Sequence, residues 1–215
     1  MSTTDRPIDR QIQELRAELA PSPEELPTLV TEFTTGRGRI GTLGVLAAQQ
    51  RRIITSDRRS LLLLATRCAD EPLGTWFAGL ADGESAALRT LPALAAACGP
   101  AANGEPLAGC QAYPSYLAWL ALNGRPGPVA AALVANFTAW GGYCASLAGA
   151  LRRFHGFGED ACAFFDFFAQ PAAELERAAA EALGPVGLTG PDLAAAREYG
   201  RLLQSYEAQF WTTLA

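Results

Sequence analysis

A glutamate within an aromatic stretch is the first residue in this sequence that could do chemistry. Glu207 follows Tyr206 and precedes Phe210 and Trp211 by three and four residues, so helical spacing places it beside those rings. A carboxyl group among apolar side chains loses hydration, which raises its pKa towards the range of a general acid or base. The alternative is a glutamate on the solvent side of the helix, because carboxylates are seldom buried.

Other polar side chains could complete such a site. Gln50 and Asp57 are seven residues apart, which is two helical turns, so they share a face that is otherwise apolar. The Gln50 amide offers a donor and an acceptor to a heterocycle. Asp57 is either a cavity carboxylate or a surface ion-pair or capping residue. Tyr113 and Tyr143 could hydrogen-bond Glu207 or a ligand, or be core aromatics.

Two further features have a structural and a functional interpretation. The arginines beside Asp57, which are Arg51, Arg52, Arg58 and Arg59, form a solvated face or meet an anionic group such as sulfate or phosphate. Cys144 lies in an apolar segment and is interpreted as a packed thiol, because no base that would activate it is evident.

Cysteine and histidine usage bears on metal and redox chemistry. The five cysteines contain no C-x-x-C pair, which argues against a zinc site or a disulfide framework. The sequence has one histidine, His155, whereas most iron, copper and zinc sites need several imidazoles or thiolates. We therefore expect no metal site and no cofactor.

Helical periodicity extends along most of the chain, with no strand-like alternation and no repeat. Residues 1–24 are interpreted as an N-terminal arm with a short helix carrying Ile8, Ile12, Leu15 and Leu19, and residues 25–215 as a single domain. Helices are predicted at 25–35, 40–69 with a possible break at 55–57, 73–83, 85–98, 106–122, 129–154, 158–183 and 192–214. The predicted fold class is all-α, a helical bundle.

Charge and hydropathy exclude several classes of protein. The net charge of −5 does not favour nucleic acid, whose phosphates need a basic face. No run of about 18 apolar residues predicts a membrane span, and the N-terminus lacks the apolar stretch of a signal peptide. We expect a cytoplasmic protein that binds neither nucleic acid nor membrane.

Four stretches in the second half of the chain resemble the TenA/thiaminase II family. Residues 112–117 are similar to its "aY-x-x-Y-L", residues 131–143 to its "AALLPC-x-W-x-Y", and residues 205–211 to its "YE-x-x-FW". Residues 164–169 occupy the place of a "W-x-x-x-YA" stretch. The similarity covers roughly residues 105–215 and implies a haem-oxygenase-like (TenA-like) helical bundle that assembles as a homo-dimer or tetramer. The N-terminal arm could instead serve a different partner chain.

The resemblance implies which residues form the site and where this chain departs from the family. Glu207 and Tyr143 are the implied catalytic residues, and the implied substrate-binding residues are Gln50, Tyr113, Asn136, Trp140, Phe168 and Trp211, to which the spacing from Gln50 adds Asp57. Ala139 takes the place of the nucleophilic cysteine, four residues before Tyr143. Cys144 would point about 100° further round the helix. Gln50 takes the place of a pyrimidine-binding aspartate.

Three functions therefore remain open. The first is a metal-free enzyme of small-molecule, specialised metabolism that acts on an amine or heterocycle by hydrolysis, elimination or C–N bond change, with Glu207 as acid/base. The second is a ligand-binding protein, and the third is a regulatory partner. Thiaminase II activity itself, the hydrolysis of an aminopyrimidine, is the narrower alternative.

Overall fold

The computed structural model of the protein describes residues 6–21, 26–99, 104–171, 173–184 and 187–215, and every regular element in them is a helix. The predicted all-α class is therefore confirmed. The helices are α1 (Pro7–Leu19), α2 (Thr28–Thr34), α3 (Ile40–Arg67), α4 (Pro72–Cys98), α5 (Ala108–Asn123), α6 (Pro126–His155), α7 (Glu159–Ala169), α8 (Ala173–Leu183) and α9 (Gly190–Leu214).

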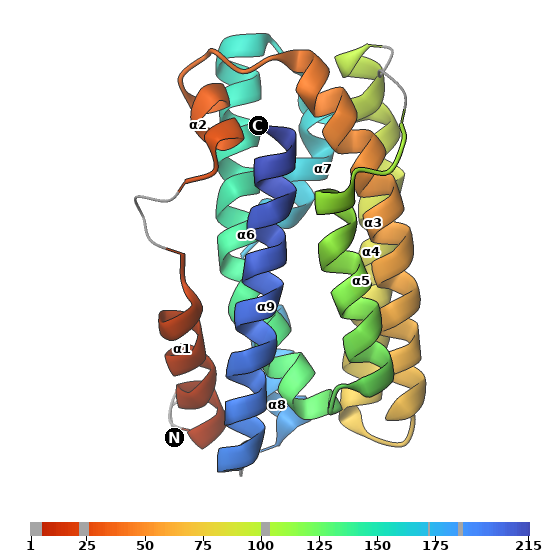
Figure 1. Ribbon diagram of the computed structural model, residues 1–215, viewed down its shortest axis with the longest axis vertical. Coiled ribbons are helices and arrows are strands. Elements are labelled where there is room, and N and C mark those ends of the chain that lie inside the picture. The colour runs from red at the N-terminus through yellow and green to blue at the C-terminus, as the bar shows by residue number, and fades with distance from the viewer. Residues whose placement is uncertain (1–5, 22–25, 100–103, 172, 185–186) are drawn as a thin grey trace.

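Six of these helices form a closed ring around the interior. Helix α3 packs against α4 and α5, α9 joins α5 to α6, and α7 joins α6 back to α4. Figure 1 shows the long helices running side by side along the molecule, with α3, α4 and α5 on one side and α6 on the other. The ring brings side chains from distant parts of the sequence to one central space.

Helices α3 and α4 are both continuous where the sequence indicated a break. The possible break at residues 55–57 is absent, since α3 continues through Thr55, whose hydroxyl donates to the Arg51 carbonyl at 2.7 Å. The expected division at Asp82 and Gly83 is also wrong, since α4 runs unbroken over 27 residues. Gly83 lies within this helix, and a Cβ atom added to it would only touch the Phe167 ring, at 3.9 Å.

The predicted single helix over 158–183 is instead two helices. Helix α7 ends at Ala169 and α8 begins at Ala173, with Gln170 and Pro171 between them. A proline cannot donate the hydrogen bond that continues a helix and disfavours helical geometry in the residue before it. Gln170 accordingly has extended backbone, with ψ of 141°. The last helix begins as expected, with a capping box between Thr189 and Asp192.

The short helix of the N-terminal segment packs onto the bundle. Helix α1 contacts α6 and α9 and buries the four apolar residues identified from their spacing, Ile8, Ile12, Leu15 and Leu19. Glu18 adds an ion pair with Arg197 of α9. The proposed boundary at residues 24 and 25 lies outside the described residues, so the division into arm and domain stays a prediction.

Two large apolar clusters fill the two ends of the bundle, and a smaller third one lies where Leu15 and Leu19 of α1 pack on α6 and α9. One of the large clusters includes Phe33, Leu46 and Phe165, and the other includes Phe77, Leu120 and Leu203. A cavity lies where the clusters meet, because its walls take Ile54 from the first and Leu133 from the second. Among the described helices, none is long and apolar enough to cross a lipid bilayer.

Candidate active site

The cavity has a volume of about 380 Å³, which suits a small organic molecule. Helices α3 to α9 all contribute to its walls. Its polar side chains are Gln50, Asp57, Glu84, Tyr113, Asn136, Gln170 and Glu207, and its aromatic ones besides Tyr113 are Phe137, Trp140, Phe167, Phe168 and Phe210. The walls thus combine a large apolar surface with a few polar groups that could orient a ligand.

Glu207 reaches the cavity from the middle of α9. Its Oε1 accepts a hydrogen bond of 3.3 Å from the indole Nε1 of Trp211, one turn further along the helix. Burial raises the pKa of Glu207 to about 7, and the hydrogen bond from Trp211 opposes part of this shift because it stabilises the carboxylate. Near neutral pH the group can therefore either donate or accept a proton.

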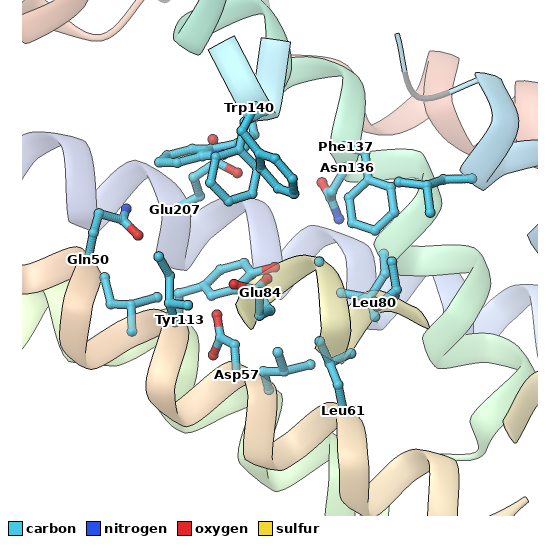
Figure 2. Close-up of a pocket in the computed structure, with 18 of the residues that line it drawn as sticks. Gln50, Asp57, Leu61, Leu80, Glu84, Tyr113, Asn136, Phe137, Trp140 and Glu207 are labelled. Carbon is cyan, nitrogen blue, oxygen red and sulfur yellow. The ribbon is translucent and has the colours of Figure 1, made fainter. Parts of the chain in front are cut away.

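Two more carboxyl groups enter the cavity, Asp57 from α3 and Glu84 from α4. Figure 2 shows them with Tyr113 on one side of the cavity, while Glu207 lies beside Trp140 on the other. Burial and the charge of Glu84 raise the pKa of Asp57 well above its ordinary value. Burial raises the pKa of Glu84 to about 8. Two carboxyls so placed do not both ionise readily.

Tyr113 lies within electrostatic range of all three acids. Its pKa is raised well above the ordinary value by burial and then by Asp57, Glu207 and Glu84, so the phenol stays protonated. The side chain is only half-buried by surface area, because part of its surface faces the cavity. A neutral phenol there can donate a hydrogen bond to a carboxylate or a ligand.

An aromatic cluster forms the wall beside Glu207. The Trp140 ring lies 5.8 Å from Phe168, 6.0 Å from Phe210 and 5.3 Å from Trp211, measured between ring centroids. Such a wall offers flat surfaces on which a heterocycle can stack and a negative ring face that attracts a cation.

Asn136 connects the cavity wall to α9. Its Oδ1 accepts a hydrogen bond of 2.6 Å from Gln204 Nε2, and its Nδ2 donates to the Ala132 carbonyl at 2.9 Å. These two bonds fix the orientation of an amide that is 4% exposed. Gln50 is equally buried, and its neighbour Gln49 instead bonds the backbone of Glu105 and Leu107.

Seven of the nine residues expected in the site line the cavity: Gln50, Asp57, Tyr113, Asn136, Trp140, Phe168 and Glu207. Trp211 is not part of the lining but bonds Glu207. Tyr143 was expected either to contact Glu207 or a ligand or to be a core aromatic, and its contact with Glu207 stays a prediction. It does not line the cavity, and its ring packs against Trp211 at 5.5 Å.

The arginines beside Asp57 do not reach the cavity. Arg51, Arg52, Arg58 and Arg59 are exposed, because helical geometry turns them away from the face that carries Asp57. Cys144 is fully buried outside the lining, and burial followed by the charge of Glu207 raises the pKa of its thiol well above the ordinary value. It therefore stays a protonated, packed thiol, as expected.

Glu84 is the ionisable residue of the cavity lining that was missed from the sequence. The dipeptide Asp82-Gly83 indicated a turn, which placed Glu84 outside any helix. A signal was nevertheless available, because Phe77, Ala81, Glu84 and Leu91 follow helical spacing through that point. Because this spacing continues without interruption from Phe77 to Leu91, it would have placed Glu84 on the buried face of a single helix.

Within the described residues, no group of three or more histidine, cysteine, aspartate or glutamate side chains has the arrangement to hold a metal ion.

Comparison with solved structures identifies the fold. A TenA homologue from Pyrococcus furiosus matches with a TM-score of 0.72 and 17% identity, covering 96% of this chain and 98% of that one. A domain of unknown function with a haem oxygenase-like fold from Shewanella denitrificans matches with a TM-score of 0.73 and 13% identity, covering 96% and 89%. No protein-family model and no curated protein matches the sequence. The expected haem-oxygenase-like, TenA-like fold is confirmed.

Proposed function

We propose that the protein is a TenA-like enzyme that acts on a small amine-bearing heterocycle held in the central cavity, with Glu207 as the acid/base. The observation that carries this proposal is the position of Glu207. Its carboxyl lies in an apolar cavity of about 380 Å³, beside an aromatic wall, with a pKa raised to about 7. A group with that pKa is suited to proton transfer near neutral pH.

The reaction that suits this arrangement best is hydrolysis of a C–N bond. Protonated Glu207 donates its proton to the departing nitrogen as the C–N bond breaks, and water supplies the oxygen of the new C–O bond. The proton released by that water returns to the Glu207 carboxylate, so the acid is regenerated. Trp140 and Phe168 would hold the ring of the substrate, and Gln50 would bond its edge.

The structure also supports a different alignment of the family's "AALLPC" stretch with the residues of α6. If "AALLPC" is aligned from Ala131 without a gap, Asn136 rather than Ala139 takes the place of the family's cysteine. Asn136 lines the cavity, whereas Ala139 does not. An amide is no nucleophile, so this register favours direct attack by water over a covalent intermediate.

The test is turnover by matched variants. The purified protein is incubated with aminomethyl-substituted pyrimidines and related heteroaromatic amines, and released ammonia is measured. The wild type should release ammonia from at least one of them, and Glu207→Gln should be slower by about 10²- to 10⁴-fold, the usual contribution of an acid/base group. Glu198→Gln, on the exposed face of the same helix, is the control and should match the wild type.

Two results would contradict the proposal. Full activity of Glu207→Gln would remove Glu207 from the chemistry. Tight binding of these amines without turnover of any of them would favour the ligand-binding alternative, in which the cavity holds a molecule and does not transform it.

A further inference from the structure

The acid/base proposal leaves Asp57 and Glu84 without a role. Asp57 is 6% exposed, and its Oδ1 has no hydrogen-bond partner although it lines the cavity. Glu84 lines the cavity on the same side and interacts with Asp57 through its charge. A buried carboxylate oxygen without a donor costs free energy, which a ligand can recover by supplying one.

No basic side chain of the described cavity wall faces these two acids. None of the described residues that line the cavity is an arginine or a histidine. The four arginines that flank Asp57 in the sequence are exposed, and two of them make other bonds, Arg52 to the Gly104 carbonyl and Arg58 to the Ser85 hydroxyl. A cation paired with Asp57 and Glu84 would therefore have to come from the ligand.

We propose that Asp57 and Glu84 form a subsite that binds a cationic nitrogen group of the ligand, an ammonium or an amidinium. This rests on the proposed function and adds that the substrate carries a second nitrogen group, separate from the C–N bond that reacts at Glu207. The planar N–H groups of an amidinium match the two oxygens of a carboxylate. Trp140 lies on the opposite side of the cavity, where the aromatic wall could contact the rest of the ligand (Figure 2).

Binding of a cation should be coupled to loss of a proton from the subsite. The titratable groups that face Asp57 and Glu84 are Tyr113 on α5 and Glu207 on α9, and the lining residues of α6, α7 and α8 include none. Burial and mutual repulsion keep at least one of the two carboxyls protonated near neutral pH. Affinity for a cation should therefore increase as pH rises from 6 towards about 8, the pKa of Glu84.

The experiment compares benzamidine with benzamide, a neutral molecule of nearly the same shape. An amidinium keeps its charge through this pH range, so any change in its affinity reports on the protein. The affinities of both molecules are measured by isothermal titration calorimetry at pH 6, 7 and 8. At pH 8 benzamidine should bind at least tenfold more tightly than benzamide. That preference should fall as the pH falls, and titration in two buffers of different ionisation enthalpy should reveal proton release.

Variants then locate the effect. Asp57→Asn alone leaves Glu84, whose ionisation becomes easier without its neighbour, so the variant should keep part of the preference and release fewer protons. The double variant Asp57→Asn/Glu84→Gln should bind the two probes equally, and both substitutions conserve shape. Asp82→Asn, an exposed position on α4, should behave as the wild type.

The subsite is refuted if the wild type binds benzamidine and benzamide equally, or if the double variant keeps the full preference. The second outcome would assign the cation to Glu207. Neither result bears on ammonia release by the wild type and Glu207→Gln, so failure of the subsite and failure of the proposed function are separable.

Discussion

The indole of Trp211 and the carboxyl of Glu207 form a hydrogen-bonded pair within one turn of α9, with 3.3 Å between Nε1 and Oε1. Trp211 is 3% exposed and packs against Trp140 and Tyr143, so its ring is held in place. The bond favours the charged form of Glu207, while the apolar surroundings favour the neutral form. The proton affinity of the proposed catalytic group thus depends on a residue outside the cavity lining.

Replacing the indole should therefore make Glu207 a weaker acid. In Trp211→Phe the donor is lost and the burial remains, so the pKa of Glu207 should rise above about 7. Carbon-13 NMR titration of glutamate carboxyls, with Glu207→Gln to assign the signal, measures the shift. Trp119→Phe, at an exposed position on α5, should leave the signal unchanged. An unaltered pKa in Trp211→Phe would show that the hydrogen bond does not tune the acid.

The raised pKa of Glu207 predicts how stability changes with pH. Below pH 4.5 the group is protonated in the folded and the unfolded state alike. Between about pH 4.5 and about pH 7 the unfolded chain has released this proton while the folded protein keeps it, so stability falls as pH rises through this range and levels off above it. Glu207→Gln avoids this loss and should exceed the wild type by up to about 3 kcal/mol at pH 8.

Urea unfolding of both proteins between pH 4 and pH 8 measures this difference. Glu198→Gln, exposed on the same helix, should show no comparable trend with pH. Parallel curves for the wild type and Glu207→Gln would mean that Glu207 is hydrated in the folded protein.

The amide of Asn136 should contribute to stability through its two hydrogen bonds. Asn136→Ala removes both and leaves Gln204 without its acceptor in a partly buried position. The expected loss is about 1–3 kcal/mol in the free energy of unfolding. Asn123→Ala removes one exposed bond to the Trp119 carbonyl and should cost far less. Equal losses in chemical denaturation would contradict the structural role of Asn136.

The packing of α1 on α6 and α9 can be tested at Leu15, which is fully buried. If α1 unfolds together with the bundle, Leu15→Ala should cost about 2–5 kcal/mol in the free energy of global unfolding. Gln13→Ala, exposed on the same helix, should have little effect. A loss confined to hydrogen-exchange protection of residues 7–19, with global stability unchanged, would identify an arm that opens independently.

Helical periodicity was sufficient to predict the fold class and the shared face of Gln50 and Asp57, because it orients a side chain whenever the helix is continuous, whereas Asn136, Trp140 and Phe168 came from the family resemblance. Gln50 and Asp57 were placed correctly since they share one uninterrupted helix. Glu84 was missed because Gly83 was interpreted as a helix break despite the continuous helical periodicity around it. Pro171 was not recognised as the residue that separates α7 from α8. Tyr143 was chosen from a motif alignment and packs against Trp211 outside the cavity lining, because no local pattern reports which wall of a cavity a residue faces.

The ring of helices also constrains the order of assembly. Helices α3 and α4 are neighbours in the sequence and can pair early, whereas α9 closes the ring against α5 and α6 across a long separation in the chain. Because α9 supplies the Phe210 and Trp211 rings that cover Trp140, a chain in which α9 has not docked would expose the aromatic wall to water and to other chains. An intermediate that lacks this closure is the species in which aggregation would compete with folding.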